Sequence, residues 1–131
     1  IMKAWKGVAF EEVCLTHIQQ IKKALEIGAI TSRESAWSIK GDKENDGTQI
    51  DLLIDRDDSI VNLCEMKFLK DKFTITKSYD EKLRSRTQML IDRLPKRATV
   101  HLTLITSYGL KYNEYSGQIQ KLLTLDSLFI E

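Results

Sequence analysis

The sequence lacks the marks of several protein classes. One proline and six glycines in 131 residues are too few for a collagen-like or low-complexity chain. There are two cysteines, Cys14 and Cys64, and both lie in apolar-periodic segments, so we expect buried, reduced thiols and no disulfide framework. The apolar runs fall far short of the roughly 18 residues that a membrane helix needs. These absences favour a single domain of cytoplasmic type.

Several catalytic signatures are also missing. The sequence has no phosphate-binding Walker A loop, no G-x-S-x-G nucleophile elbow and no H-E-x-x-H zinc helix. With 42% hydrophobic residues, a chain of this length can bury an ordinary apolar core without metal staples. Any metal ion would therefore serve chemistry and not the stability of the fold.

The near-neutral total charge hides a strong asymmetry along the chain. The whole sequence has 20 basic and 19 acidic residues, but residues 67–97 hold ten Lys and Arg against four acids, a net charge of +6. Eight acids fall in residues 42–65, immediately before this basic stretch. An acidic cluster beside a basic field can hold cations next to a polyanion, although both runs could also be solvated surfaces.

The apolar pattern predicts alternating helices and strands. Ser78 and Glu81 have the spacing of a capping box at the start of a second helix, which Pro95 ends. In chain order the pattern predicts a helix at 7–27 ended by Gly28, a strand at 35–40, an acidic loop at 41–48, strands at 49–56 and 60–68, a short extension at 73–76, the second helix at 78–94, a strand at 99–106, an edge strand at 119–125 and a helical turn at 126–130. The order αβββαβ predicts an α/β fold with a mixed sheet flanked by helices.

The two central strands place two carboxylates face to face. A three-residue loop at 57–59 would pair Asp51 with Glu65, whereas a loop of even length would pair Asp51 with Cys64. Side-chain alternation puts Lys67 on the same face as Glu65. Opposed like charges destabilise a sheet, so we expect Lys67 or a divalent cation to offset them. Without a cation, one carboxylate should have a strongly raised pKa.

The first predicted helix carries a further acid. Glu11 falls inside its apolar arc, where a carboxylate needs a partner, and a structural salt bridge and a role in a site are equally compatible with that position. His17, also on the inner face, is more typical of a hydrogen-bonded core histidine than of a metal ligand.

Asp51, the later Glu65-Met66-Lys67 and the helical Glu11, in an αβββαβ order, resemble the PD-(D/E)XK nuclease superfamily with its restriction-endonuclease-like fold. Five stretches are more closely similar to the C-terminal nuclease-like domain of prokaryotic DEXX-box-type AAA ATPases: 5–14, 49–55, 63–68, 106–109 and 113–117. This resemblance implies that residues 1–131 form one nuclease-like domain, following an ATPase module in a longer polypeptide. The Walker A motif would then belong to that module.

The resemblance also implies roles for individual residues. Asp51, Glu65 and Glu11 would hold Mg²⁺ or Mn²⁺, and Lys67 would orient the attacking water or stabilise the developing phosphorane charge. Cleavage of DNA phosphodiesters would follow, with the Met66 carbonyl assisting the metal. Basic residues of the following stretch are candidates for DNA phosphate contacts: Lys70, Lys72, Lys82, Arg84 and Arg86.

Two departures from the family pattern qualify this interpretation. Ile50 stands where the family name has a proline, at a loosely kept position, and Gln88 is followed four residues later by Asp92, so the Gln-x-x-x-Tyr signature of the exonuclease-like branch is absent. We therefore do not infer an exonuclease. The alternative function is a catalytically inactive module that binds DNA or protein and regulates the ATPase.

Overall fold

The computed structural model describes residues 16–39 and 48–128. Within these ranges the chain forms two α-helices, five strands and two short 3₁₀ helices. In chain order they are α2 (Ile18–Ala24), β1 (Ser32–Ile39), β2 (Thr48–Arg56), β3 (Ile60–Lys67), α3 (Lys77–Ile91), β4 (Thr99–Thr106), η1 (Ser116–Gln118), β5 (Lys121–Thr124) and η2 (Leu125–Leu128). No helix in the described part of the chain is long and apolar enough to cross a membrane.

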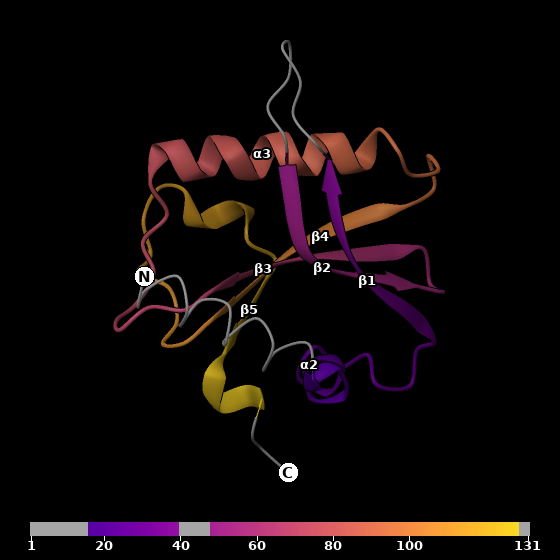
Figure 1. Cartoon of the computed structure of the whole chain (residues 1–131), viewed down its shortest axis with the longest axis horizontal. Helices are drawn as coiled ribbons and strands as arrows, with labels where there is room; N and C mark the ends of the chain where they lie inside the picture. The colour runs from indigo at the N-terminus through magenta and orange to yellow at the C-terminus, as the bar shows by residue number, and fades with distance from the viewer. Residues whose placement is uncertain (1–15, 40–47, 129–131) are drawn as a thin grey trace.

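The five strands form one mixed sheet in the order β1-β2-β3-β4-β5. The first three strands are antiparallel to one another, and β3, β4 and β5 run parallel. Helix α3 connects β3 to β4 and lies across one face of the sheet, while α2 lies on the other (Figure 1). The predicted α/β fold with an αβββαβ order is therefore confirmed, and β5 extends it by one strand.

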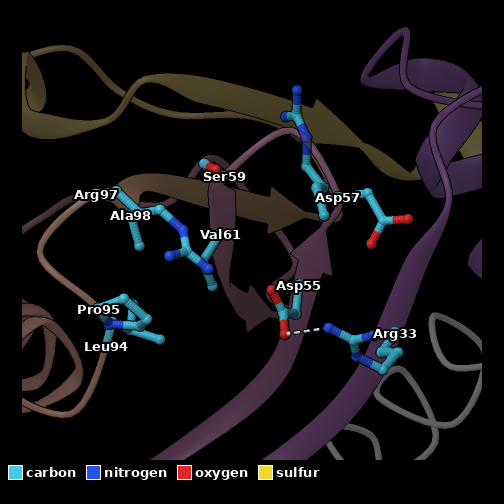
Figure 2. A pocket seen from close by; sticks show the side chains of 10 residues that line it. Arg33, Asp55, Asp57, Ser59, Val61, Leu94, Pro95, Arg97 and Ala98 are labelled. Atoms are coloured by element: carbon cyan, nitrogen blue, oxygen red, sulfur yellow. Dashed lines mark hydrogen bonds and ion pairs between the residues drawn. The ribbon is translucent and has the colours of Figure 1, made fainter.

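The β2–β3 hairpin has the predicted odd-length loop. Asp55 pairs with Val61, and the pairing continues to Leu52 and Cys64. The same register sets Arg56 across from Ile60, so residues 57–59 form the loop. Ser59 has φ +66°, in the left-handed region that commonly closes a three-residue hairpin. On the outer side of β2, Arg33 of β1 forms an ion pair with Asp55 (Figure 2).

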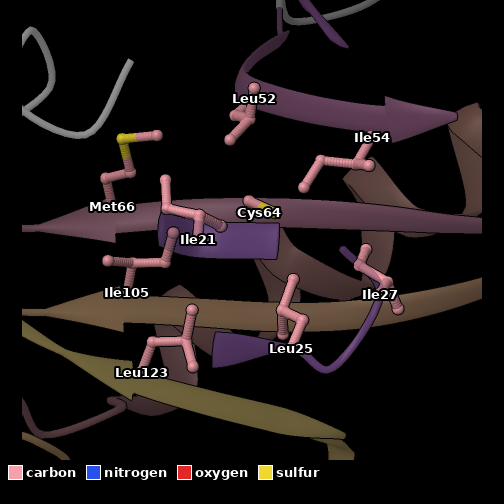
Figure 3. Close-up of a cluster of buried hydrophobic side chains, with 9 residues drawn as sticks. All are labelled: Ile21, Leu25, Ile27, Leu52, Ile54, Cys64, Met66, Ile105 and Leu123. Carbon is pink, nitrogen blue, oxygen red and sulfur yellow. The ribbon is translucent and has the colours of Figure 1, made fainter. Parts of the chain in front are cut away.

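Apolar side chains pack on both faces of the sheet. On the α2 face, Ile21 of the helix and Leu25 directly after it pack against Leu52 and Ile54 of β2 and Cys64 of β3 (Figure 3). On the α3 face, the buried cluster consists of Ile50, Val61, Leu63, Leu83, Leu90 and Leu102. Cys64 is buried, as expected, and Cys14 lies outside the described residues.

A β-bulge in β2 was not predicted. The β1–β2 register pairs Ser35 with Leu53 but Trp37 with Ile50, so two residues of β2 stand opposite one residue of β1. These two residues are Asp51 and Leu52. The bulge shifts the alternation, and Ile50 therefore packs with the α3-face cluster while Leu52 packs on the opposite face. Asp51 lies at this irregularity.

Several element boundaries differ from the predictions. Helix α2 ends at Ala24 and not at Gly28, because Glu26 adopts a left-handed conformation with φ +63°. The first part of the predicted helix, at 7–15, and the acidic loop at 40–47 lie outside the described residues. Strand β1 begins three residues earlier than predicted, at Ser32, and β5 covers only Lys121–Thr124.

The start of α3 also differs. Its N-cap is Thr76, whose hydroxyl accepts a hydrogen bond from the Tyr79 amide at 3.1 Å, so the predicted cap at Ser78 is wrong by two residues. The predicted extension at 73–76 is a single parallel bridge between Phe73 and Leu110. Thr76 satisfies an amide that the first turn of a helix leaves without an internal partner.

Candidate functional site

The structure brings Asp51 and Glu65 together on neighbouring strands. The paired residues of β2 and β3 end at Leu52 and Cys64, and Asp51 and Glu65 are the next residues along the two strands. The carboxylate of Asp51 accepts a hydrogen bond from the Met66 amide at 3.1 Å, and this bond holds it against β3. The predicted hairpin register is thus confirmed, and the bulge positions the Asp51 carboxylate at the end of the ladder.

Glu65 is almost completely buried, with 2% of its surface exposed. Its carboxylate accepts a hydrogen bond at 3.0 Å from the guanidinium of Arg86, which projects from α3. Burial raises the pKa of Glu65, the charge of Arg86 lowers it, the nearby charge of Asp51 raises it and the charge of Lys67 lowers it, and the net result is a pKa of about 7. The expectation that one opposed carboxylate has a strongly raised pKa is confirmed. Burial also raises the pKa of Asp51, while its bond to the Met66 amide lowers it.

Lys67 lies beside the two carboxylates on an aromatic support. Its Nζ atom is 4.7 Å from the ring centre of Tyr79 and 6.0 Å from that of Phe73. The two rings are in edge-to-face contact at 5.1 Å. Cation–π attraction to these rings restrains the ammonium group, and its charge lowers the pKa values of both Asp51 and Glu65.

The carboxylate cluster has five members, and Tyr79 is the fifth after Asp51, Glu65, Arg86 and Lys67. Burial and the charges of Glu65 and Asp51 raise the pKa of its hydroxyl, so the phenol is neutral at physiological pH. The hydroxyl is buried and forms no hydrogen bond of normal geometry within the described ranges. Arg86 nevertheless lowers the pKa of Tyr79 through its charge and a side-chain contact, which places the guanidinium next to the phenol.

The cluster offers two carboxylates to a metal ion. Glu11, the third predicted ligand, lies outside the described residues. Among residues 16–39 and 48–128 there is no group of three or more His, Cys, Asp or Glu side chains that could hold a metal. Two carboxylates still fit Mg²⁺, which commonly takes one or two from the protein and completes its octahedron with water and phosphate oxygens.

The predicted phosphate-contacting bases have different environments. Arg86 is committed to Glu65, and Arg84 pairs with the buried Asp80 at 2.9 Å, although its own side chain is 67% exposed. Asp80 also accepts a hydrogen bond from Gln118. The three predicted lysines are exposed: Lys70, Lys72 and Lys82. These lysines remain available for phosphate contacts, whereas Arg86 is part of the carboxylate cluster.

Sequence reasoning missed Arg86, Tyr79 and Phe73 as neighbours of the carboxylates. A signal for Arg86 was present, because it falls three residues after Leu83 and four before Leu90 in the apolar stripe of α3. A charged residue inside such a stripe needs a buried partner. The bulge at Asp51 had no comparable signal in the sequence.

A separate cavity lies at the other end of β3, next to the hairpin loop (Figure 2). Its volume is about 250 Å³, and its lining includes Arg33, Asp55, Arg56 and Arg97 above an apolar floor. Arg33 pairs with Asp55 at 3.3 Å, and Arg56 pairs with Asp58 at 2.5 Å. These carboxylates neutralise two of the three arginines, so the cavity does not present a strongly positive surface.

No protein-family model and no curated protein sequence matches the chain. Among solved structures, the chain is similar to the crystal structure of AF1548, a protein of unknown function, with a TM-score of 0.53 and 13% sequence identity. The similarity covers 88% of this chain and 64% of that chain. This chain therefore spans less than two thirds of the length of AF1548, and the similarity concerns the fold alone.

Proposed function

We propose that this domain hydrolyses DNA phosphodiester bonds with the help of a divalent metal ion bound at Asp51 and Glu65. The observation that carries the proposal is the opposition of two desolvated carboxylates, with Lys67 held next to them. A bound cation would relieve both the desolvation and the mutual repulsion of the carboxylates. The donor set therefore fits Mg²⁺ or Mn²⁺.

The residues of the cluster have distinct roles in this proposal. The metal, held by Asp51 and Glu65, would act as a Lewis acid on the scissile phosphate and lower the pKa of a bound water. Lys67 would place a positive charge where the phosphorane develops, and its aromatic support would keep that charge in position before the reaction. Tyr79 and Phe73 are positioning residues for Lys67. Arg86 would have to release Glu65 before both carboxylate oxygens could bind metal.

The ion pair between Arg86 and Glu65 favours a second candidate function. Asp51, Glu65, Lys67 and Arg86 together have no net formal charge, so the protein's own cations already compensate the two carboxylates. A module that kept these residues as scaffold would need no metal. It would bind DNA or protein without cleaving, and regulate an attached enzyme.

The wider setting follows from the family resemblance. We infer that the domain follows an ATPase module in its polypeptide, acts on DNA in the cytoplasm and belongs with PD-(D/E)XK nucleases. The exposed Lys70, Lys72 and Lys82 support the DNA assignment, because phosphate contacts are made by such bases.

Calorimetric titration with Mn²⁺ tests the metal site directly. The wild-type domain should bind Mn²⁺, and Asp51→Ala should bind it much more weakly, by about tenfold or more for a lost ligand. Asp55→Ala is the matched control, because Asp55 lies on the same strand but pairs with Arg33 away from the cluster. In parallel, wild type but not Asp51→Ala should cleave DNA with Mg²⁺ or Mn²⁺. If the wild-type domain binds no Mn²⁺, the second candidate function, binding without cleavage, is favoured.

A further inference from the structure

We propose that the segments following β3 and β4 form a binding surface for single-stranded DNA, with Tyr108 and Tyr112 as stacking platforms. The inference rests on the proposed function for its biological meaning, because it names the form of DNA that the carboxylate cluster would act on. Its evidence is independent of that cluster. It consists of two exposed aromatic rings, a group of exposed lysines and the backbone contacts that fix them.

The two tyrosines are unusually exposed. Tyr108 is 59% exposed and Tyr112 is 76% exposed, and with Ile91 on α3 they are the exposed large hydrophobic residues of the described part of the chain. They lie within five residues of each other, on either side of the buried Leu110. Aromatic rings held in water at two nearby positions offer faces on which bases can stack.

The backbone beneath the rings is anchored. Gly109 has φ +96°, which a glycine adopts without strain, and its amide donates to the Thr106 hydroxyl at 2.6 Å. Farther along, the Asn113 side-chain amide donates to the Ile75 carbonyl at 2.9 Å and ties the residue after Tyr112 to the start of α3. The rings therefore project from fixed points, so binding would require little ordering of the backbone.

The connection after β3 is joined to this segment. Phe73 donates to the Gly109 carbonyl at 2.8 Å and accepts from the Lys111 amide at 2.8 Å. The Ser107 hydroxyl both accepts from the amide and donates to the carbonyl of Leu69. Figure 1 shows both connections leaving the same end of the sheet. Exposed residues of the two connections therefore belong to one surface.

This surface is basic. Three lysines are exposed on the two connections, against the two acids Asp71 and Glu114; they are Lys70, Lys72 and Lys111, and the exposed Lys77 follows at the start of α3. Lysine is depleted in protein–protein interfaces, whereas lysines beside exposed aromatic rings are typical of surfaces that bind single strands. The composition therefore favours DNA over a protein partner.

The surface is continuous with the carboxylate cluster. Lys67 stands opposite Thr106 in the parallel pair, and its carbonyl accepts a hydrogen bond from the Ser107 amide at 3.3 Å. The Phe73 ring lies 6.0 Å from Lys67 Nζ, while the Phe73 backbone bonds Gly109. Tyr108 follows Thr106 by two residues, so a strand stacked on it would pass near the end of β3 that carries Lys67.

Fluorescence anisotropy with labelled oligo(dT) of about 16 nucleotides in EDTA tests this surface without metal or cleavage. The wild-type domain should bind the single strand more tightly than a duplex of the same length. Tyr108→Ala and Tyr112→Ala should each weaken binding about five- to tenfold or more, as expected for the loss of one stacked base. Tyr108→Phe and Tyr112→Phe should retain the wild-type affinity, because stacking needs the ring and not the hydroxyl.

Two further variants complete the design. Ile91→Ala, a truncation of an exposed hydrophobic on the far end of α3, is the matched control and should bind as wild type. Lys72→Gln with Lys111→Gln should reduce the salt dependence of binding, because fewer counterions are released from the strand. Wild-type binding by the Tyr108→Ala, Tyr112→Ala double variant, or no binding of oligo(dT) at low salt, would overturn the proposal.

The outcomes separate this surface from the proposed activity. Ring-dependent binding of oligo(dT) in EDTA with no cleavage on addition of Mg²⁺ or Mn²⁺ would refute the nuclease and leave the surface standing. Cleavage of DNA together with oligo(dT) binding that is unaffected by loss of both rings would support the nuclease and refute the surface.

Discussion

Glu65 occupies the least favourable position for a charged group in the cluster. It is buried between Asp51, which repels its charge, and Arg86, which attracts it. Burial raises the pKa of Glu65 more than the neighbouring charges together lower it, so the protonated form is favoured until near neutral pH. A carboxylate in this balance responds strongly to a change in either the local cations or the pH.

We predict a stability that depends on pH in the absence of metal. The pKa of Glu65 rises from its ordinary 4.5 to about 7 on folding, so the folded state holds the proton more tightly than the unfolded state. The unfolding free energy should therefore be highest below about pH 4.5 with respect to this group, and fall as pH rises to about 7, by up to about 3 kcal/mol. Urea unfolding across this pH range measures the slope.

Glu65→Gln is the control for this dependence. Glutamine has nearly the same volume and no titrating group, so the variant should lose most of the slope over the same pH range. The raised pKa of Asp51 has the same sign and would account for a remaining part. A wild-type slope of opposite sign would show that Glu65 is ionised and stabilised by Arg86 in the folded protein.

A second prediction concerns Arg86. Arg86→Gln removes the ion pair with Glu65 and should destabilise the metal-free domain by about 1–3 kcal/mol at neutral pH, because a buried group loses a charged partner. The same change removes a competing cation, so Mn²⁺ should bind about tenfold more tightly for each 1.4 kcal/mol of repulsion relieved. Calorimetry and urea unfolding give the two values. Weaker Mn²⁺ binding in the variant would indicate that Arg86 supports the metal-bound form.

At the scale of elements, α3 determines most of the site. Tyr79 and Arg86 lie seven residues apart on its inner face, with Leu83 between them, and reach the end of β3 that carries Lys67 and Glu65. The bulge in β2 brings Asp51 to the same place. The site therefore depends on how α3 is anchored across the sheet.

The helix start offers a direct measurement of that anchoring. Thr76→Ala removes the hydroxyl that accepts from the Tyr79 amide and should cost about 1 kcal/mol of unfolding free energy. Ser78→Ala is the matched control. Ser78 lies inside the first turn and is exposed, so this variant should change the unfolding free energy by no more than about 0.5 kcal/mol. Equal losses in the two variants would contradict the assignment of the cap to Thr76.

For the whole molecule, the proposed metal site would link metal binding to folding. The folded cluster assembles residues from β2, β3 and α3, so an ion that binds there stabilises the entire fold by mass action. The metal-free domain bears the cost of the opposed carboxylates without that gain.

Asp51→Asn tests this linkage. Asparagine can still accept from the Met66 amide, and it removes one of two opposed charges, so without metal the variant should melt at the wild-type temperature or slightly higher. With excess Mn²⁺ the order should reverse, with wild type gaining about 2.7 kcal/mol at a hundredfold excess over Kd. Thermal unfolding with and without Mn²⁺ gives both comparisons. A large metal-free loss with no Mn²⁺ effect on wild type would make Asp51 a structural residue.

Local periodicity was sufficient to predict the order of the strands and part of the site. Side-chain alternation placed Glu65 and Lys67 on one face, and the odd-length turn at 57–59 set the register that pairs Leu52 with Cys64 and brings Asp51 near Glu65. Such features depend on residues close in sequence, where strand geometry and turn length leave few choices. The αβββαβ order followed from the same rules.

Tertiary packing decided what surrounds these residues. The crossing of α3 over the sheet selected Arg86 as the partner of Glu65 and set Tyr79 and Phe73 beneath Lys67. These contacts join residues from different elements, and their geometry depends on how the helix packs against the sheet. No spacing along the chain encodes that arrangement, because many helix positions would bury the same apolar stripe equally well.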